Sequence, residues 1–268
     1  MLLYHLVFLL LLVGSTGVFL GLAVLNVRHA SRTVRDRAEW LAETLGIEDP
    51  DRLLEYHRLT TASGQLQSVM LLGLLLVFLY TGFFGEFVSL IYSDIGNQLV
   101  AGIVLFVSVT ITLQVIHLPF SAFETFGIED AFGFNEQSPS LFVRDTLVST
   151  AIGVVLVALV GGAVLFVVER FPDWWWLGAT GVVAIFSLGS QILVPRVIMP
   201  LFYDFEPVED SDLREAVDWV FERAGFTCED VYEMNASSRS GHSNAFFTGF
   251  GAAKRVVLYD TLIEQLEE

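Results

Sequence analysis

A short polar loop that runs directly into an apolar segment is the part of the sequence best suited to chemistry. Small and polar residues crowd positions 237–244, and the strand-forming residues Ala245–Thr248 follow at once. If such a strand stays exposed, it offers its backbone N–H and C=O groups to an extended peptide. The pattern is also typical of an ordinary loop before a buried strand, and the residues alone leave both interpretations open.

Histidine and cysteine, two common ligands of catalytic metals, are scarce in this chain. The five histidines stand at positions 5, 29, 57, 117 and 242, and none is followed by glutamate. Cys228 is the only cysteine, so neither an intrachain disulfide nor a cysteine-based zinc knuckle can form. His242 could be a zinc ligand, but a single histidine in a polar loop more often makes hydrogen bonds. We therefore assign no catalytic and no metal-binding residue to this chain.

Five long apolar segments precede the polar loop, at residues 2–25, 69–92, 99–118, 147–168 and 174–199. A helix needs about 20 apolar residues to cross roughly 30 Å of hydrocarbon, and a helix pairs its own backbone amides. The chain is 54% apolar and 17% charged, against about 45–50% and 25% in soluble domains. The sequence therefore predicts a mainly α polytopic membrane protein, with five spans in residues 1–200.

Glu86 is a charged residue in the second of these segments. A carboxylate inside a span normally faces protein or a water-filled cavity. The alternative is that the span ends near Phe87 and that Glu86 lies at the outer interface, and the sequence does not separate the two.

The distribution of lysine and arginine predicts the orientation of the spans. These residues gather between Arg28 and Arg58 and again between Arg214 and Arg255, whereas the connection between the second and third segments has none. The positive-inside rule then places the N-terminus outside and the C-terminal tail in the cytoplasm of a multi-pass cell-membrane protein. The net charge of −17 argues against a nucleic-acid partner, because phosphates need lysine and arginine.

Residues 201–268 differ from the spans in being acidic and periodic, which predicts a small α+β region. A helix is expected from Asp210 or Ser211 to Gly225. Strands are expected at residues 231–234, 245–248 and 256–259, with a hairpin or close loop at Gly249 and Gly251. Thr261 and Glu264 have capping-box spacing, so a second helix is expected from Leu262. Residues 119–146 are expected to form a polar loop.

Three segments closely resemble the CaaX prenyl protease type I family of integral-membrane zinc metalloproteases. The first is the sequence RSGHSNAFFTGF from Arg239, followed by KRVVLYDTL from Lys254. The second is residues 123–145, in which Gly133, Phe134 and Asn135 match the family's Gly-Phe-Asn. The third is residues 197–217, which are similar to the family's exit from the fifth span. These matches keep the family's order and spacing and, with the five spans, cover nearly the whole chain.

The resemblance implies a zinc metalloendopeptidase that cleaves peptides near the cytoplasmic membrane face. The family carries an HExxH helix shortly after the VLYDTL strand, with two zinc-binding histidines and a glutamate that polarises water. No HExxH occurs here, so the resemblance implies the N-terminal portion only, with residues 201–268 beginning the metalloprotease domain. The zinc ligands are then expected C-terminal to this chain, and the fragment alone is expected to be inactive.

The resemblance also assigns roles to individual residues. Residues Asn244, Ala245, Phe246 and Phe247 would form the edge strand that holds the substrate. Asn135, Arg239 and His242 would support the motif, and Arg239 would brace the loop or pair with an acid on a segment outside the chain. The substrate would be a prenylated protein or a misfolded membrane protein.

Five spans fit a second function class equally well, namely a non-catalytic membrane protein such as a transporter or a scaffold. An HExxH in the sequence that follows would decide for the protease.

Overall fold

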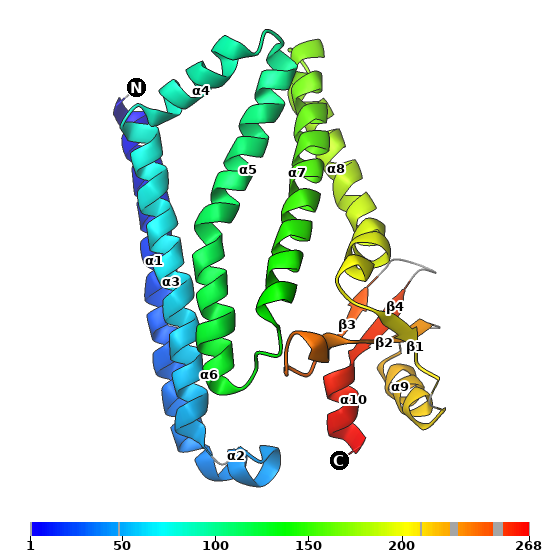
Figure 1. Ribbon diagram of the computed structural model, residues 1–268. Helices are drawn as coiled ribbons and strands as arrows, with labels where there is room; N and C mark the ends of the chain where they lie inside the picture. Colours follow the sequence, from blue (N-terminus) through cyan, green and yellow to red (C-terminus); the bar gives the residue numbers. More distant parts are fainter. Residues whose placement is uncertain (1, 48, 210, 226–229, 249–253, 268) are drawn as a thin grey trace. The chain divides into compact units, whose positions relative to one another are not determined.

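The computed structural model describes residues 2–47, 49–209, 211–225, 230–248 and 254–267, and it is largely helical (Figure 1). It divides into two compact units, Met1–Asp94 with Leu113–Phe132 and Ile95–Thr112 with Gly133–Glu268. Five helical segments are long and apolar enough to cross a membrane, at Leu2–Asp36, Pro50–Tyr80, Gln98–Phe132, Pro139–Arg170 and Trp175–Leu201. The prediction of a mainly α fold with five spans is confirmed. The predicted domain division after residue 200 stays a prediction, because both units contain span residues.

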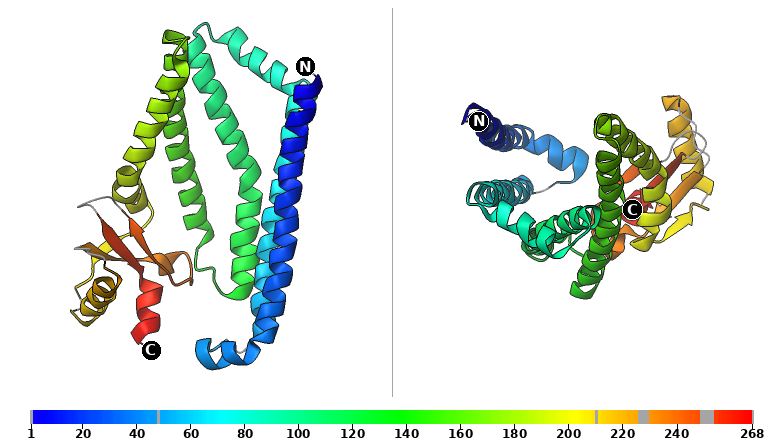
Figure 2. Two further views of the ribbon diagram at one scale, coloured as in Figure 1. Left: turned by 180° about the vertical axis from the view of Figure 1, so that it is seen from behind. Right: turned by 90° about the horizontal axis from the view of Figure 1, so that it is seen from above.

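The first unit is built on two long helices, α1 (Leu2–Asp36) and α3 (Pro50–Tyr80), which run side by side (Figures 1 and 2). The short helix α2 (Ala38–Leu45) joins them. Helix α3 begins with Pro50 after Asp49, whose side chain accepts a hydrogen bond from the Arg52 N–H at 3.0 Å. This is a favourable start, because proline has no N–H to leave unpaired and the aspartate pairs one that would be.

The second predicted span was wrong at its C-terminal end. Helix α3 stops at Tyr80, and α4 (Phe83–Asp94) is a separate helix beyond Gly82, whose φ is +93°. A positive φ interrupts a right-handed helix and is tolerated by glycine. The apolar run continues through α4, so hydropathy did not reveal the break. Glu86 is exposed in the first turn of α4, and the premise that it lies inside a span was also wrong.

The predicted polar loop at residues 119–146 was wrong over most of its length. Helix α5 (Gln98–Phe123) continues through Pro119 into a π-helix, Glu124–Glu129, and then into α6 (Asp130–Phe132). Helix α7 (Pro139–Arg170) begins soon after, with Ser138 accepting a hydrogen bond from the Leu141 N–H. The polar residues here mark an exit from the apolar segment rather than the end of a helix, so only residues 133–138 form a connection.

In the second unit, α7 packs against α8 (Trp175–Leu193). The two helices approach closely at Gly178, where an added Cβ would lie 2.4 Å from Val167. After α8 the chain continues through a π-helix, Val194–Ile198, and a 3-10 turn, Met199–Leu201. It then enters a small sheet.

The sheet has four strands in the order β1-β2-β4-β3. They are β1 (Phe205–Pro207), β2 (Asp230–Met234), β3 (Ala245–Thr248) and β4 (Arg255–Tyr259). Strands β2 and β4 are parallel, and the other two pairs are antiparallel. The predicted α+β character and the three predicted strands are confirmed. Strand β1 was missed, because it has only three residues, includes a proline and is defined by its pairing with β2.

Both faces of the sheet are covered by apolar side chains. One face packs α9 (Ser211–Ala224) and α10 (Asp260–Glu267) around a cluster of Phe221, Val231, Val256 and Leu258. The other face carries Met234, Ala236 and Val257, surrounded by partly buried aromatic residues and Met199. The amphipathic period predicted for α9 thus faces the sheet.

Two further predictions concern helix ends. Gly225 ends α9 with a φ of +67°, as expected. The capping role of Thr261 was wrong, because α10 begins at Asp260 and the Thr261 hydroxyl donates to the His242 carbonyl at 3.0 Å. Asp260 takes that place, and its Oδ1 accepts from the N–H groups of Thr261 and Ser237. The expected turn at Gly249 and Gly251 and the cap at Asp210 lie outside the described residues.

Candidate functional site

The two loops singled out from the sequence, residues 133–137 and 237–244, lie against each other in the second unit. Asn135 forms a β-bridge with Ser240. The Glu136 N–H donates to the Arg239 carbonyl at 3.3 Å, and the Gly241 N–H donates to the Phe134 carbonyl at 3.0 Å. Residues about 100 positions apart thus form one backbone-paired segment.

Side chains reinforce this pairing. The His242 ring stacks on Phe134, with 4.3 Å between ring centroids and 23° between planes. Asn135 accepts a hydrogen bond from the Gln137 N–H at 3.0 Å and so shapes its own loop. The three residues expected to support the motif, Asn135, Arg239 and His242, are therefore gathered in one place.

His242 has the contacts of a residue that holds the loop in shape. Its N–H donates to the Ser240 hydroxyl at 3.2 Å, and its carbonyl accepts from Thr261. Nowhere in the described ranges do three histidine, cysteine, aspartate or glutamate side chains gather as a metal site would require. These residues therefore do not fit a catalytic metal by themselves.

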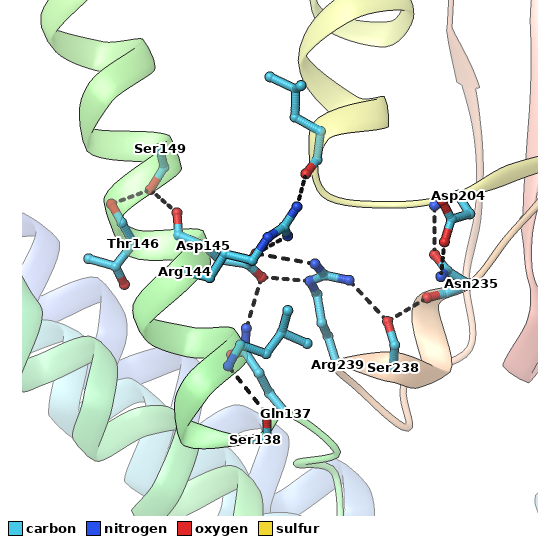
Figure 3. Close-up of polar contacts among 12 residues, drawn as sticks. Gln137, Ser138, Arg144, Asp145, Thr146, Ser149, Asp204, Asn235, Ser238 and Arg239 are labelled. Atoms are coloured by element: carbon cyan, nitrogen blue, oxygen red, sulfur yellow. Dashed lines mark hydrogen bonds and ion pairs between the residues drawn. The ribbon is translucent and has the colours of Figure 1, made fainter.

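Arg239 pairs with Asp145, which lies near the start of α7 (Figure 3). Its Nε donates to Asp145 Oδ2 at 2.7 Å and its Nη2 to Oδ1 at 3.2 Å. The two side chains are 12% and 15% exposed, so the pair is largely withdrawn from solvent. Of the two roles considered for Arg239, pairing with an acid outside the chain is replaced by pairing with an acid within it.

The Arg239 guanidinium makes two further contacts. Its Nη1 donates to the Ser238 hydroxyl at 3.0 Å, and its Cζ lies 4.5 Å from the centre of the Tyr203 ring. Burial raises the pKa of the Tyr203 phenol above its usual value, although the neighbouring positive charge of Arg239 opposes this shift. A cation over an aromatic face is attractive and fixes the plane of the guanidinium.

Asp145 was quoted in the sequence comparison but given no role, although it is the centre of this network. It also accepts from Gln137 Nε2 at 3.0 Å and from Arg144 Nη1 at 3.1 Å. The available signal was a carboxylate next to the fourth apolar segment, where an isolated charge is costly and so needs a partner.

Strand β3 lies at one edge of the sheet, and its register determines which backbone groups face outward. The Tyr259 N–H donates to the Asn244 carbonyl at 3.0 Å, and the register pairs Phe246 with Val257. In an antiparallel ladder, hydrogen-bonded and non-hydrogen-bonded pairs alternate. The backbone groups of Phe246 therefore point toward β4, and those of Ala245 and Phe247 point away from it.

The four residues expected to bind substrate are thus not equivalent. The Asn244 Oδ1 accepts a hydrogen bond from the Ala245 N–H at 2.8 Å. The side chains of Ala245 and Phe247 line an apolar cavity of about 280 Å³ beneath α9 and α10. The Phe246 side chain lies on the opposite face, beside Met234 and Val257.

Comparison with known proteins follows from this arrangement. Residues 26–204 match a family described as CAAX prenyl protease N-terminal, five membrane helices, and residues 207–268 match peptidase family M48. The chain belongs to the CAAX prenyl protease family of M48 metallopeptidases. Together with the five helices, this makes it a multi-pass membrane protein.

Individual relatives agree with this assignment. The chain is 36% identical over 159 residues to a probable CAAX prenyl protease 1 of Schizosaccharomyces pombe, covering 59% of this chain and 34% of that protein. It is 38% identical over 152 residues to a CAAX prenyl protease 1 homolog of Arabidopsis thaliana, covering 57% and 36%. The match thus spans about a third of the length of these curated relatives.

A solved structure shares the fold. The crystal structure of S. mikatae Ste24p superposes with a TM-score of 0.71 at 25% identity, over 90% of this chain and 60% of that one. The expected resemblance to the family is therefore confirmed in sequence and in fold.

Proposed function

We propose that the whole protein is a membrane-bound metalloendopeptidase that binds an extended peptide along the outer edge of β3. The observation that carries this proposal is the edge position of β3, with the Ala245 N–H and C=O directed away from β4. Membership of the M48 family supports peptide hydrolysis. It also favours a protease over a transporter or scaffold.

In this proposal Asn244 covers the binding edge when no peptide is present. Its Oδ1 accepts the Ala245 N–H, which is the donor that a substrate carbonyl would use. A bound peptide would displace the Asn244 side chain and pair with the strand in its place. Backbone pairing of this kind supplies affinity with little dependence on substrate sequence.

The M48 family implies a metal, typically zinc, which polarises the attacked carbonyl and activates water when it is bound. Because the described residues supply no metal-binding cluster, we infer that its ligands lie C-terminal to this chain and that the fragment alone is inactive. The relatives are named CAAX prenyl proteases, which favours a prenylated protein as substrate, with misfolded membrane proteins as the alternative. Cleavage would take place on the cytoplasmic face of the cell membrane.

Replacing Ala245 with proline in the full-length protein tests the edge directly. Proline removes the outward N–H and leaves the ladder to β4 intact, since Ala245 is at a non-hydrogen-bonded position. Its effect on the preceding residue also holds Asn244 extended. We expect kcat/KM for a peptide substrate to fall about fivefold for one lost hydrogen bond, and further if alignment suffers. Metal content should not change.

Ala245→Val is the matched control, because valine adds side-chain bulk and keeps the N–H. The other edge of the sheet already contains such a proline, since Pro207 of β1 lies between the ladder bonds made by Asp204 and Val208. Folding of the Ala245→Pro variant is therefore expected. Wild-type kcat/KM in a folded Ala245→Pro protein would contradict binding at this edge.

A further inference from the structure

The structure assigns to Asp145 the role of a positioning residue for substrate alignment, acting through Arg239 on the strand edge. This inference rests on the proposed function of β3 as the peptide-binding edge. Asp145 belongs to membrane helix α7, and β3 belongs to the small sheet. The connection between them runs through the loop at residues 239–244.

The Asp145 carboxylate is fully occupied (Figure 3). An ionised carboxylate offers about four acceptor sites. Here Oδ1 accepts from Arg239 Nη2 and Arg144 Nη1, and Oδ2 accepts from Arg239 Nε and Gln137 Nε2. One residue of α7 thus holds both the 133–137 loop, through Gln137, and the 237–244 loop, through Arg239.

The two arginines depend on Asp145 to different degrees. Arg144 is 54% exposed, and its Nη2 also donates to the Leu201 carbonyl, so water could replace its bond to Asp145. Arg239 is 12% exposed, and water has little access to it. A buried cation that loses its anion must move or become hydrated. Removing the carboxylate should therefore displace Arg239.

Displacement of Arg239 is transmitted to the edge because only five residues separate Arg239 from Asn244. Within this stretch, Gly241 is tied to Phe134 and His242 to Thr261. The last residue, Asn244, is bonded to Tyr259 through its carbonyl and covers the Ala245 N–H with its side chain. The strand keeps its ladder to β4, so what Asp145 determines is the placement of the edge rather than the existence of the strand.

The test uses Asp145→Ala in the full-length protein in lipid nanodiscs, with a prenylated peptide, well below the melting temperature. We expect kcat/KM to fall about tenfold or more, with the loss mainly in kcat, because small displacements near a reacting centre are costly. Metal content should stay at the wild-type level. Amide hydrogen exchange at Gly241 and Tyr259 should become faster. Asp145→Glu, which restores the charge, should recover part of the activity.

Asp218→Ala is the matched control. Asp218 pairs with Arg214 one helical turn away on α9, and its side chain is 53% exposed. Loss of this ion pair should change neither kcat/KM nor exchange at Gly241. The double variant Asp145→Ala/Arg239→Ala should be no worse than Arg239→Ala alone if Asp145 acts through Arg239.

The outcomes separate this inference from the proposed function. If Asp145→Ala lowers only the melting temperature and its kcat/KM stays at the wild-type level, Asp145 is structural and the positioning role is wrong. A loss in Ala245→Pro with a normal Asp145→Ala enzyme would overturn this inference and leave the edge-strand function standing. Normal Ala245→Pro activity with a loss in Asp145→Ala would overturn the edge-strand function, and with it the route assigned to Asp145.

Discussion

At the scale of single residues, the sequence identified the loop partners but not the carboxylate that holds them. Asn135, Arg239 and His242 stand within short distinctive motifs, and the structure gathers them. Asp145 is separated from Arg239 by 94 positions. A contact between side chains so distant in sequence depends on the fold, which no local pattern of residue types encodes.

Tyr203 gives the arginine cluster a measurable pH dependence. An unfolded tyrosine ionises near pH 10, and burial raises the pKa of folded Tyr203 above that value. The stabilisation associated with its neutral form is therefore complete below about pH 10 and is lost as pH rises through the folded pKa. We expect Tyr203→Phe to show a shallower fall in melting temperature between about pH 9.5 and 11.5 than the wild type. Parallel curves would mean that Tyr203 ionises as freely as in the unfolded chain.

At the scale of secondary-structure elements, strands and amphipathic helices were more predictable than the ends of the spans. Strand β3 and helix α9 have the expected positions, because alternation and helical periodicity are local properties. The end of α3 was not found, because a single backbone angle at Gly82 decides it within a uniformly apolar run. Strand β1 depends on a partner strand and carries little signal of its own.

Gly82 and Gly85 allow this break to be tested. An added Cβ would meet nothing within 4 Å at either position, but only Gly82 has a positive φ. Gly82→Ala should lower the free energy of unfolding by about 1–2 kcal/mol because of backbone strain. Gly85→Ala lies within helix α4 and should raise it by up to about 1 kcal/mol. Thermal unfolding of the two variants in the same detergent measures the difference. Equal shifts would show that the angle at Gly82 carries no strain.

At the scale of the whole molecule, composition and motif order were sufficient for the membrane class and the family. The predicted orientation rests on the distribution of lysine and arginine, and it can be measured. Single cysteines at Asp94 and Glu215, with Cys228 replaced by serine, place exposed reporters on α4 and α9. We expect a membrane-impermeant maleimide to label position 94 in intact cells, and position 215 only after permeabilisation. Labelling of both from the same side would reverse part of the topology.

The two outer strands of the sheet also bear on how the protein avoids sticking to itself. Exposed strand edges are the usual sites of edge-to-edge aggregation, and proline is a common protection. Strand β1 has this protection permanently, through Pro207. Strand β3 has it reversibly, through the Asn244 side chain that covers the Ala245 N–H. The sheet can therefore remain soluble at both edges and still keep one of them available to a chain that competes successfully with an asparagine.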